Sequence, residues 1–192
     1  MGDLMATNAG RAITAEELFH YPDHDRYELV AGSLRVSEPP GGAHGQVAMR
    51  LGYRLHGFVE AHSLGVVLVE SGFILRRGPD TVRGPDVSFV ASDRLDPKRI
   101  PANYIPLAPD LAIEILSPED RPGEVAEKVA NYLDAGTKLV WVVDAKAREV
   151  IIHRADRSTT RLGATDWLDG EGVMPGFRCL VAEFLPALAP PG

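Results

Sequence analysis

Two stretches of the chain are apolar almost without interruption, and they predict two buried strands. Residues 110–118 carry one acid, Glu114, in the middle of the apolar run that follows Asp110, and residues 139–144 read Leu-Val-Trp-Val-Val-Asp. Apolar runs of this length are typical of strands covered on both faces, as in the centre of a sheet flanked by helices. We therefore expect residues 110–118 to form the central strand of the fold.

Helical spacing of apolar residues predicts two longer helices. The first spans residues 43–61, and the second spans residues 123–135, where Val125, Val129 and Tyr132 share one face. The second helix joins the two buried strands. A strand, a helix and a strand in this order predict a right-handed parallel crossover.

Alternating and turn-rich segments predict the smaller elements. A capping box at Thr14 to Glu17 is expected to begin a short helix, and a turn that contains glycine predicts a hairpin over residues 27–36. Residues 86–90 resemble the central strand, with an acid at the start of a short apolar run. The remaining segments predict a bent or paired strand (66–75), an irregular excursion (92–109), a hairpin strand (149–154) and short strands in the tail (167–185).

Length and composition indicate one domain. A chain of 192 residues that is 45% hydrophobic can bury one sizeable core, and it shows no repeat and no linker. We expect a loose arm at residues 1–12, a core at residues 13–185 and a tail at residues 186–192. The expected fold class is α/β, with a mixed central sheet flanked by helices and with added β-hairpins.

Charge and cysteine content restrict the partners and the compartment. A formal net charge of −7 excludes a general attraction to nucleic acid, so any such binding needs a local basic group. The candidates for that group are Arg76, Arg77, Arg94, Lys98 and Arg99. A single cysteine, Cys179, excludes an internal disulfide and a multi-cysteine zinc site, which fits a reducing, cytoplasmic location. No apolar run is long enough to predict a membrane span.

Two acids on apolar strands suggest a cation site. Asp86 precedes one strand and Glu114 lies inside another, where a carboxylate is costly to bury without a partner. Oxygen ligands of this kind suit Mg²⁺ or Mn²⁺. Two alternatives remain open at this point. Asp86 can be a simple turn acid, and Glu114 can pair with an arginine such as Arg50 or Arg54.

These residues resemble the Uma-two family of the PD-(D/E)XK restriction-endonuclease-like superfamily. The resemblance covers about residues 14–185 and is carried by Glu28 in a hairpin, His44 at the start of a helix, Gly-Pro-Asp86, Glu114-Ile-Leu-Ser and a lysine in the next helix. It implies a restriction-endonuclease-like core, divalent metal and DNA cleavage, with Asp86 and Glu114 as metal ligands. It also implies that Glu28 contacts the metal or its water shell, and that His44 orients substrate or assists proton transfer.

One position departs from the superfamily pattern. The lysine expected two residues after the acid is replaced by Leu116, which can neither orient a water nor offset charge on a phosphate. Some members of the superfamily supply this lysine from the next helix, and Lys128 matches that placement. Lys128 can instead pair with Glu124, four residues earlier on the same helix. The alternatives for Glu28 and His44 are a solvent-facing strand residue and a surface or capping histidine.

The function expected from these features is a metal-dependent endodeoxyribonuclease that works as a homodimer, since one such core reaches one strand of a duplex. Whether the chain is an enzyme stays open at this point. The main alternative is a non-catalytic nuclease-fold protein that binds nucleic acid or a protein, which the acidic charge and Leu116 favour. A hydrolase of another phosphoester is a third possibility.

Overall fold

The structure is a computed structural model, and it describes residues 11–36 and 40–186. Most of the arm expected at residues 1–12 and nearly all of the tail expected at residues 186–192 therefore lie outside the described residues.

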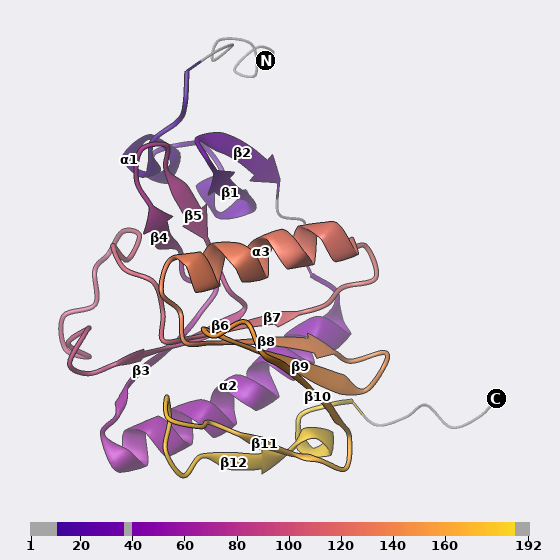
Figure 1. The fold of residues 1–192 in the computed structure, drawn as a ribbon. Helices are drawn as coiled ribbons and strands as arrows, with labels where there is room; N and C mark the ends of the chain where they lie inside the picture. Colours follow the sequence, from indigo (N-terminus) through magenta and orange to yellow (C-terminus); the bar gives the residue numbers. More distant parts are fainter. Residues whose placement is uncertain (1–10, 37–39, 187–192) are drawn as a thin grey trace.

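A six-stranded sheet in the order β10-β9-β8-β7-β6-β3 forms the centre of the fold (Figure 1). Strands β7 and β8 are parallel and every other pair in this sheet is antiparallel, so the sheet is mixed, as predicted. Its strands are β3 (Gly65–Val69), β6 (Val87–Ala91), β7 (Leu111–Ile115), β8 (Leu139–Asp144), β9 (Glu149–Arg154) and β10 (Thr159–Gly163). The central strand predicted around Glu114 is thus confirmed.

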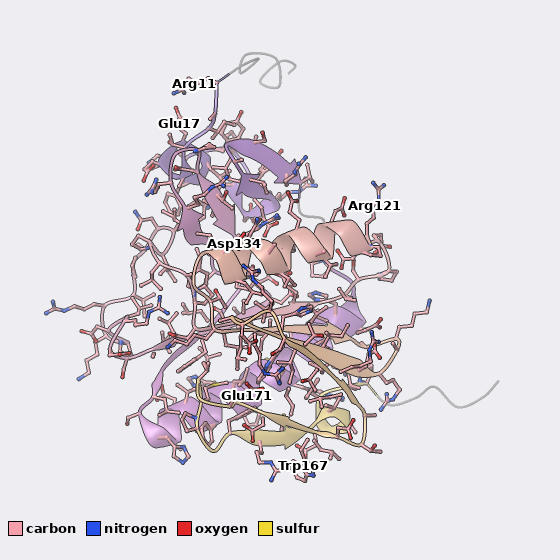
Figure 2. All side chains as sticks on the ribbon, viewed as in Figure 1. Arg11, Glu17, Arg121, Asp134, Trp167 and Glu171 are labelled. Carbon is pink, nitrogen blue, oxygen red and sulfur yellow. The ribbon has the colours of Figure 1, made fainter. Side chains whose placement is uncertain are left out.

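Two helices cover opposite faces of this sheet (Figure 1). Helix α2 (Gly42–His62) lies on one face, and helix α3 (Pro122–Asp134) lies on the other. Helix α3 begins after Arg121 and ends at Asp134, both labelled in Figure 2, and it forms the predicted crossover between β7 and β8.

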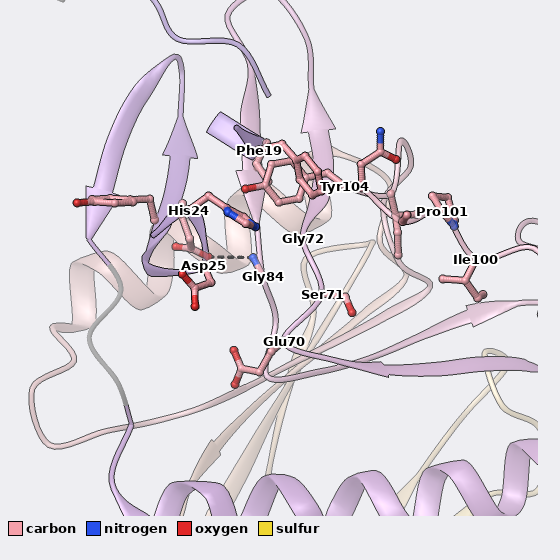
Figure 3. A pocket seen from close by; sticks show the side chains of 16 residues that line it. Phe19, His24, Asp25, Glu70, Ser71, Gly72, Gly84, Ile100, Pro101 and Tyr104 are labelled. Carbon is pink, nitrogen blue, oxygen red and sulfur yellow. Dashed lines mark hydrogen bonds between the residues drawn. The ribbon is translucent and has the colours of Figure 1, made fainter. Parts of the chain in front are cut away.

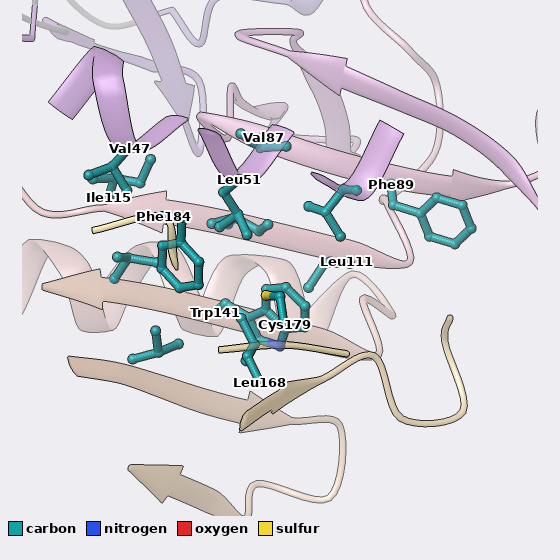
Figure 4. Close-up of a cluster of buried hydrophobic side chains, with 14 of the residues drawn as sticks. Val47, Leu51, Val87, Phe89, Leu111, Ile115, Trp141, Leu168, Cys179 and Phe184 are labelled. Carbon is teal, nitrogen blue, oxygen red and sulfur yellow. The ribbon is translucent and has the colours of Figure 1, made fainter. Parts of the chain in front are cut away.

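Strand β7 alternates between the two faces of the sheet, because successive strand residues point in opposite directions. Leu111, Ile113 and Ile115 pack in the large core cluster with α2 (Figure 4). Ala112 packs on the other side, in the cluster formed with α3. Glu114 lies two residues after Ala112 and points to the same face, so its carboxyl is directed towards α3.

A smaller four-stranded sheet, in the order β2-β1-β5-β4, stands beside the α3 face (Figure 1). Its strands are β1 (Tyr27–Val30), β2 (Ser33–Val36), β4 (Phe73–Arg76) and β5 (Thr81–Arg83). The predicted hairpin of β1 and β2 turns at Ala31 and Gly32, which have φ of 49° and 77°. Two consecutive positive φ angles are typical of the tight turns that join hairpin strands.

Short elements complete the fold at either end of the chain. Helix α1 (Ala15–Phe19) carries the predicted capping box, and the 3-10 helix η1 (His24–Arg26) leads into β1. A two-stranded sheet of β11 (Trp167–Asp169) and β12 (Arg178–Leu180) precedes the 3-10 helix η2 (Val181–Glu183). Within residues 11–36 and 40–186, no helix is long and apolar enough to cross a membrane.

Three features of the smaller strands were not predicted. The segments 66–70 and 72–75 were expected to form one bent or paired unit, but β3 and β4 belong to different sheets. The chain leaves the large sheet at Glu70, whose φ of 49° is left-handed. Strand β5 has only three residues, and β10 reads Thr-Thr-Arg-Leu-Gly, so neither carries a clear apolar alternation.

Candidate active site

A row of three acids crosses one end of the large sheet. Val87 of β6 pairs with the last residue of β3 and with the residue before Glu114 in β7. Continuing both pairings by one residue places Asp86 between Glu70 and Glu114, and directly opposite residues on neighbouring strands lie close together. The backbone supports this placement, because the Glu70 N–H donates to the Asp86 carbonyl at 3.4 Å. Strand register therefore brings three acidic residues side by side at this end of the sheet.

Asp86 is held by contacts from two elements. Its Oδ2 accepts a 2.6 Å hydrogen bond from the backbone N–H of Ile115 in β7, and it lies 3.2 Å from Nε2 of His44. His44 comes from the first turn of α2, and only 9% of its side chain is exposed. The hydrogen bond to Asp86 raises the pKa of His44 above its usual range, although burial acts in the opposite direction. The alternative of a surface histidine is wrong.

Glu114 is the most buried acid of the row. Its Oε2 accepts a 2.9 Å hydrogen bond from Nζ of Lys128, and its Oε1 accepts a 2.7 Å bond from the hydroxyl of Tyr132. Burial raises the pKa of Glu114 to about 7, despite the opposing charge of Lys128, and the charges of Asp86 and Glu28 add to the rise. This carboxyl therefore binds a proton more readily than an ordinary glutamate does.

Lys128 reaches the row from α3. Its ammonium lies 2.9 Å from Glu114 and 4.0 Å from Glu28, so it is directed towards these two acids rather than towards Glu124. Glu28 and the acidic row together are called the acidic cluster below. Burial alone would lower the pKa of Lys128, but the two carboxylates outweigh it and the pKa is raised, so the side chain stays charged. Leu116 packs with the apolar residues under α3. The placement predicted for Lys128 is confirmed, and its role stays a prediction.

Glu28 lies at the same cluster and is held by an arginine. Its Oε2 accepts a 2.7 Å bond from Nη1 of Arg83, and its Oε1 accepts a 3.1 Å bond from the backbone N–H of Gly84. Arg83 is buried and also donates to the Asn131 side chain of α3 at 2.9 Å. The alternative in which Glu28 points to solvent is wrong, because only 13% of its side chain is exposed.

The arginine alternatives for Glu114 are also wrong. Arg50 donates to the Leu185 carbonyl, and Arg54 donates to the Glu183 carbonyl and lies 3.2 Å from its carboxylate. Lys138, the next lysine in the chain after Lys128, is not at this site: it lies 2.9 Å from Asp110, which precedes β7 at the opposite end of that strand from Glu114.

Sequence reasoning missed three contributors to the cluster. Glu70 was placed only at the end of a strand, and its pKa is raised by partial removal from water and by the charge of Asp86. Tyr132 was assigned to the inward face of a helix, without its hydroxyl contact to Glu114. Arg83 was not singled out at all. Strand register is the signal that finds Glu70, and it becomes available only once the strand pairing is known.

The predicted basic group is partly engaged in ion pairs. Arg77 contacts Glu16 at 2.7 Å and Asp80 at 2.8 Å, and Arg94 lies 2.9 Å from Asp110. Arg77 and Arg94 are therefore less available to a phosphate than the sequence suggested.

The donor set suits a hard divalent cation. Burial raises the pKa values of Glu70 and Glu114, and the charges of the neighbouring carboxylates, Glu28 and Asp86, add to the rise. Among the described residues, the polar side-chain contacts of Asp86 use Oδ2, so Oδ1 keeps its lone pairs for another ligand. Across residues 11–36 and 40–186, however, no three His, Cys, Asp or Glu side chains already converge as a metal site. A cation would have to draw Glu114 away from Lys128.

Comparison with known proteins provides an independent finding. The model of the Uma2 family, described as "Putative restriction endonuclease", matches residues 15–183. Among solved structures, the chain is similar to a crystal structure from Anabaena variabilis described as "a putative nuclease belonging to DUF820". The two share 20% sequence identity and a TM-score of 0.79, over 90% of this chain and 97% of the other. No curated protein matches the chain significantly.

Proposed function

The chain belongs to the Uma2 family and has a restriction-endonuclease-like fold, and on this premise we propose that it is a divalent-metal-dependent endonuclease that hydrolyses DNA phosphodiester bonds. The observation that carries this proposal is the contact of Lys128 with Glu114, at 2.9 Å, beside the acids Asp86 and Glu70. A row of carboxylates with one fixed cation at its side suits metal-assisted phosphoryl transfer, because the acids can hold the metal and the cation can offset charge on the phosphate.

Asp86 and Glu114 would hold the metal, and Glu70 stands beside them as a third oxygen donor. When bound, Mg²⁺ or Mn²⁺ would supply an activated water and would offset negative charge on the phosphate. Lys128 keeps its proton, so it would donate hydrogen bonds to a phosphate oxygen or align the attacking water.

His44 and Glu28 would act at the margins of this site. His44 lies 3.2 Å from Asp86, and the hydrogen bond between them raises the pKa of His44, which makes it the candidate to give a proton to the departing oxygen. Glu28 is fixed by Arg83 and lies 4.0 Å from the Lys128 ammonium, which makes it a residue that positions Lys128.

Plasmid nicking with Mn²⁺ tests the proposal. The wild-type protein is expected to convert supercoiled plasmid to open-circular and linear forms, and Asp86→Asn is expected to lose this activity. A parallel assay with a small chromogenic phosphodiester separates a nuclease from a hydrolase of other phosphoesters. Hydrolysis of the small ester alone would contradict DNA as the substrate.

A binding module is the second candidate function. The observation that favours it is that both oxygens of Glu114 already have partners within the chain, Lys128 and Tyr132. Calorimetric titration with Mn²⁺ separates the two candidates, because the nuclease must bind the ion at Asp86 whereas the binding module need not.

We also propose that the protein acts as a homodimer, because one site reaches one strand of a duplex. A two-fold arrangement would present two equal sites to the two strands. Light scattering coupled to gel filtration measures the mass directly, and a strictly monomeric protein that makes double-strand breaks would contradict this part of the proposal.

A further inference from the structure

A pocket of about 270 Å³ opens beside the acidic row (Figure 3). It lies between the small sheet and the segment 100–105, and Glu28 and Glu70 form part of its wall. Its volume is just below the range of sites for drug-sized ligands, so it suits one small ring system. Because it shares two carboxylates with the candidate active site, a group bound in it would lie next to whatever occupies that site.

Aromatic rings form one wall of this pocket. Phe19 packs edge-on against Tyr104, with ring centroids 5.3 Å apart, and lies 5.1 Å from the ring of His24. Tyr104 also lies close against the backbone at Gly72, where an added Cβ would come within 2.4 Å of the tyrosine ring. Tyr104 is therefore held in place against Gly72, which lies two residues after Glu70 in the chain.

One polar atom in this wall lacks a partner. The hydroxyl oxygen of Tyr104 is buried and has no hydrogen bond among the described residues. Burial raises the pKa of Tyr104 to about 12, and the charge of Asp25 adds to the rise. Buried polar groups in proteins are nearly always hydrogen-bonded, so this hydroxyl would gain a partner if a ligand in the pocket displaced the side chains that cover it.

Three acids among the lining residues favour one ligand chemistry. Asp25, Glu28 and Glu70 present carboxylates to the pocket, which repel phosphate and accept hydrogen bonds from N–H groups. A flat ring that carries an amino group satisfies both the aromatic wall and these acceptors. Adenine, guanine and cytosine have such an amino group, whereas thymine does not.

From this geometry we propose that the pocket binds one unpaired nucleobase next to the phosphate at the acidic row. The inference rests on the proposed nuclease function and defines its substrate as single-stranded DNA, or as duplex DNA with an unpaired nucleotide at the cleavage point. A paired base cannot enter a pocket of this size, because it must first leave the stack. Bases that carry an amino group are preferred over thymine.

Fluorescence anisotropy with labelled oligonucleotides tests the pocket without requiring cleavage. The probes are oligo-dA, oligo-dC, oligo-dT and a blunt duplex of the same length, in EDTA and in Ca²⁺, with their integrity checked on a denaturing gel. We expect oligo-dA and oligo-dC to bind more tightly than oligo-dT, and the duplex to bind most weakly. Tyr104→Ala should weaken single-strand binding about 5- to 100-fold, the range typical of a lost stacking contact.

Two milder variants and one control keep the test independent of folding. Tyr104→Phe removes only the unpaired hydroxyl. Asp25→Asn replaces one acceptor oxygen by an NH2 donor and removes the charge, so it should reduce the preference for amino-bearing bases. Trp167→Ala is the matched control, because this exposed aromatic lies in β11, away from the pocket (Figure 2). Its affinity for every probe should equal that of the wild-type protein.

The outcomes separate this proposal from the proposed function. If all pocket variants bind the single strands as the wild type does, or if the duplex binds as tightly, the pocket proposal is overturned while plasmid nicking can still stand. If the variants lose single-strand affinity but no metal supports cleavage, the pocket stands and the nuclease proposal fails. Absence of binding to every probe overturns the pocket proposal as well.

Discussion

The ammonium of Lys128 lies 2.9 Å from Oε2 of Glu114, although the two residues come from different elements and are 14 positions apart in the chain. Helix α3 crosses the face of the sheet to which Glu114 points, so the lysine stem runs beside apolar residues and its charged end reaches the acid. The superfamily pattern expects a lysine at position 116, where this sequence has Leu116. Lys128 supplies a cation to Glu114 from α3 instead.

Replacement of Lys128 is expected to abolish most of the nuclease activity. Lys128→Met keeps the length of the stem but removes the charge, and the loss of one donor aimed at developing charge typically lowers the rate about 100- to 1000-fold. The rate of plasmid nicking in Mn²⁺ measures this. Lys146→Ala is the matched control, because that lysine is exposed in the turn between β8 and β9. An unchanged rate in Lys128→Met would remove the lysine from the mechanism.

Asp86→Asn is expected to abolish Mn²⁺ binding while leaving the fold intact. The amide keeps the shape of the side chain and can still accept the Ile115 N–H, but it lacks the charge that a divalent ion needs. Calorimetric titration with Mn²⁺ measures the affinity, and circular dichroism checks the fold. Asp156→Asn, in an exposed turn, should bind the ion like the wild type. Equal affinities in the two variants would rule out Asp86 as a ligand.

The stability of the metal-free protein is expected to fall as the pH rises from about 4.5 to 7, in part through Glu114. The pKa of this acid in the folded chain is about 7, above its ordinary value of 4.5, so in this window the folded chain binds more protons than the unfolded one. Stability is then lost with rising pH, with a slope of about 1 kcal/mol per pH unit. His44 also has a raised pKa and adds a loss of the same sign.

Comparison with Glu114→Gln isolates the contribution of Glu114. The glutamine does not titrate. As the pH rises through this window, the unfolding free energy of the wild type should therefore fall relative to that of the variant. Urea unfolding in EDTA at several pH values measures the difference, in which the contribution of His44 largely cancels. A difference that stays constant with pH would show that Glu114 titrates normally.

The fold and the central part of the site could be predicted from local patterns. The apolar run around Glu114 identified a strand covered on both faces. Such a strand is apolar at nearly every position, and this pattern is visible in the sequence without the tertiary structure. The stripe through Val125, Val129 and Tyr132 oriented α3, and this orientation was enough to bring Lys128 towards the acid. These inferences depend on short-range periodicity, and the structure confirms the placements.

The residues that were missed depend on long-range pairing. Glu70 joins the acidic row only because β3 pairs with β6 in one particular register, and no local pattern encodes that register. For Glu28, alternation along the strand left both a solvent-facing and a site position open, and only the resemblance placed it at the site, because no local pattern tells which face meets Arg83. Tyr132 was correctly called buried, but its hydroxyl partner is set by the crossing of α3 over β7.

Loss of Arg83 is expected to destabilise the fold strongly. This arginine is buried and joins Glu28 of the small sheet to Asn131 of α3, and removal of one partner of a buried pair typically costs about 3–5 kcal/mol. Arg83→Met should therefore unfold at a much lower urea concentration than the wild type. The double variant with Glu28→Gln should recover part of the loss, since no uncompensated charge then remains. Additive losses would mean that the pair is not coupled.

DNA binding is expected to be weak and steeply sensitive to salt. The net charge of −7 opposes association, and two of the predicted basic residues, Arg77 and Arg94, already contact buried carboxylates. If the other three, Arg76, Lys98 and Arg99, neutralise about three phosphates, the dissociation constant should rise about 40-fold between about 50 and 200 mM salt. Anisotropy of a labelled oligonucleotide across this range measures the slope.

Single substitutions in the basic group test this slope residue by residue. Lys98→Ala and Arg99→Ala should each weaken binding of every oligonucleotide alike and lower the salt slope by about one, because a phosphate contact carries no base preference. Arg94→Ala should change the slope less, since this arginine is held 2.9 Å from Asp110. Tight binding that hardly varies with salt would mean that the protein holds DNA through the bases or the metal rather than through these cations.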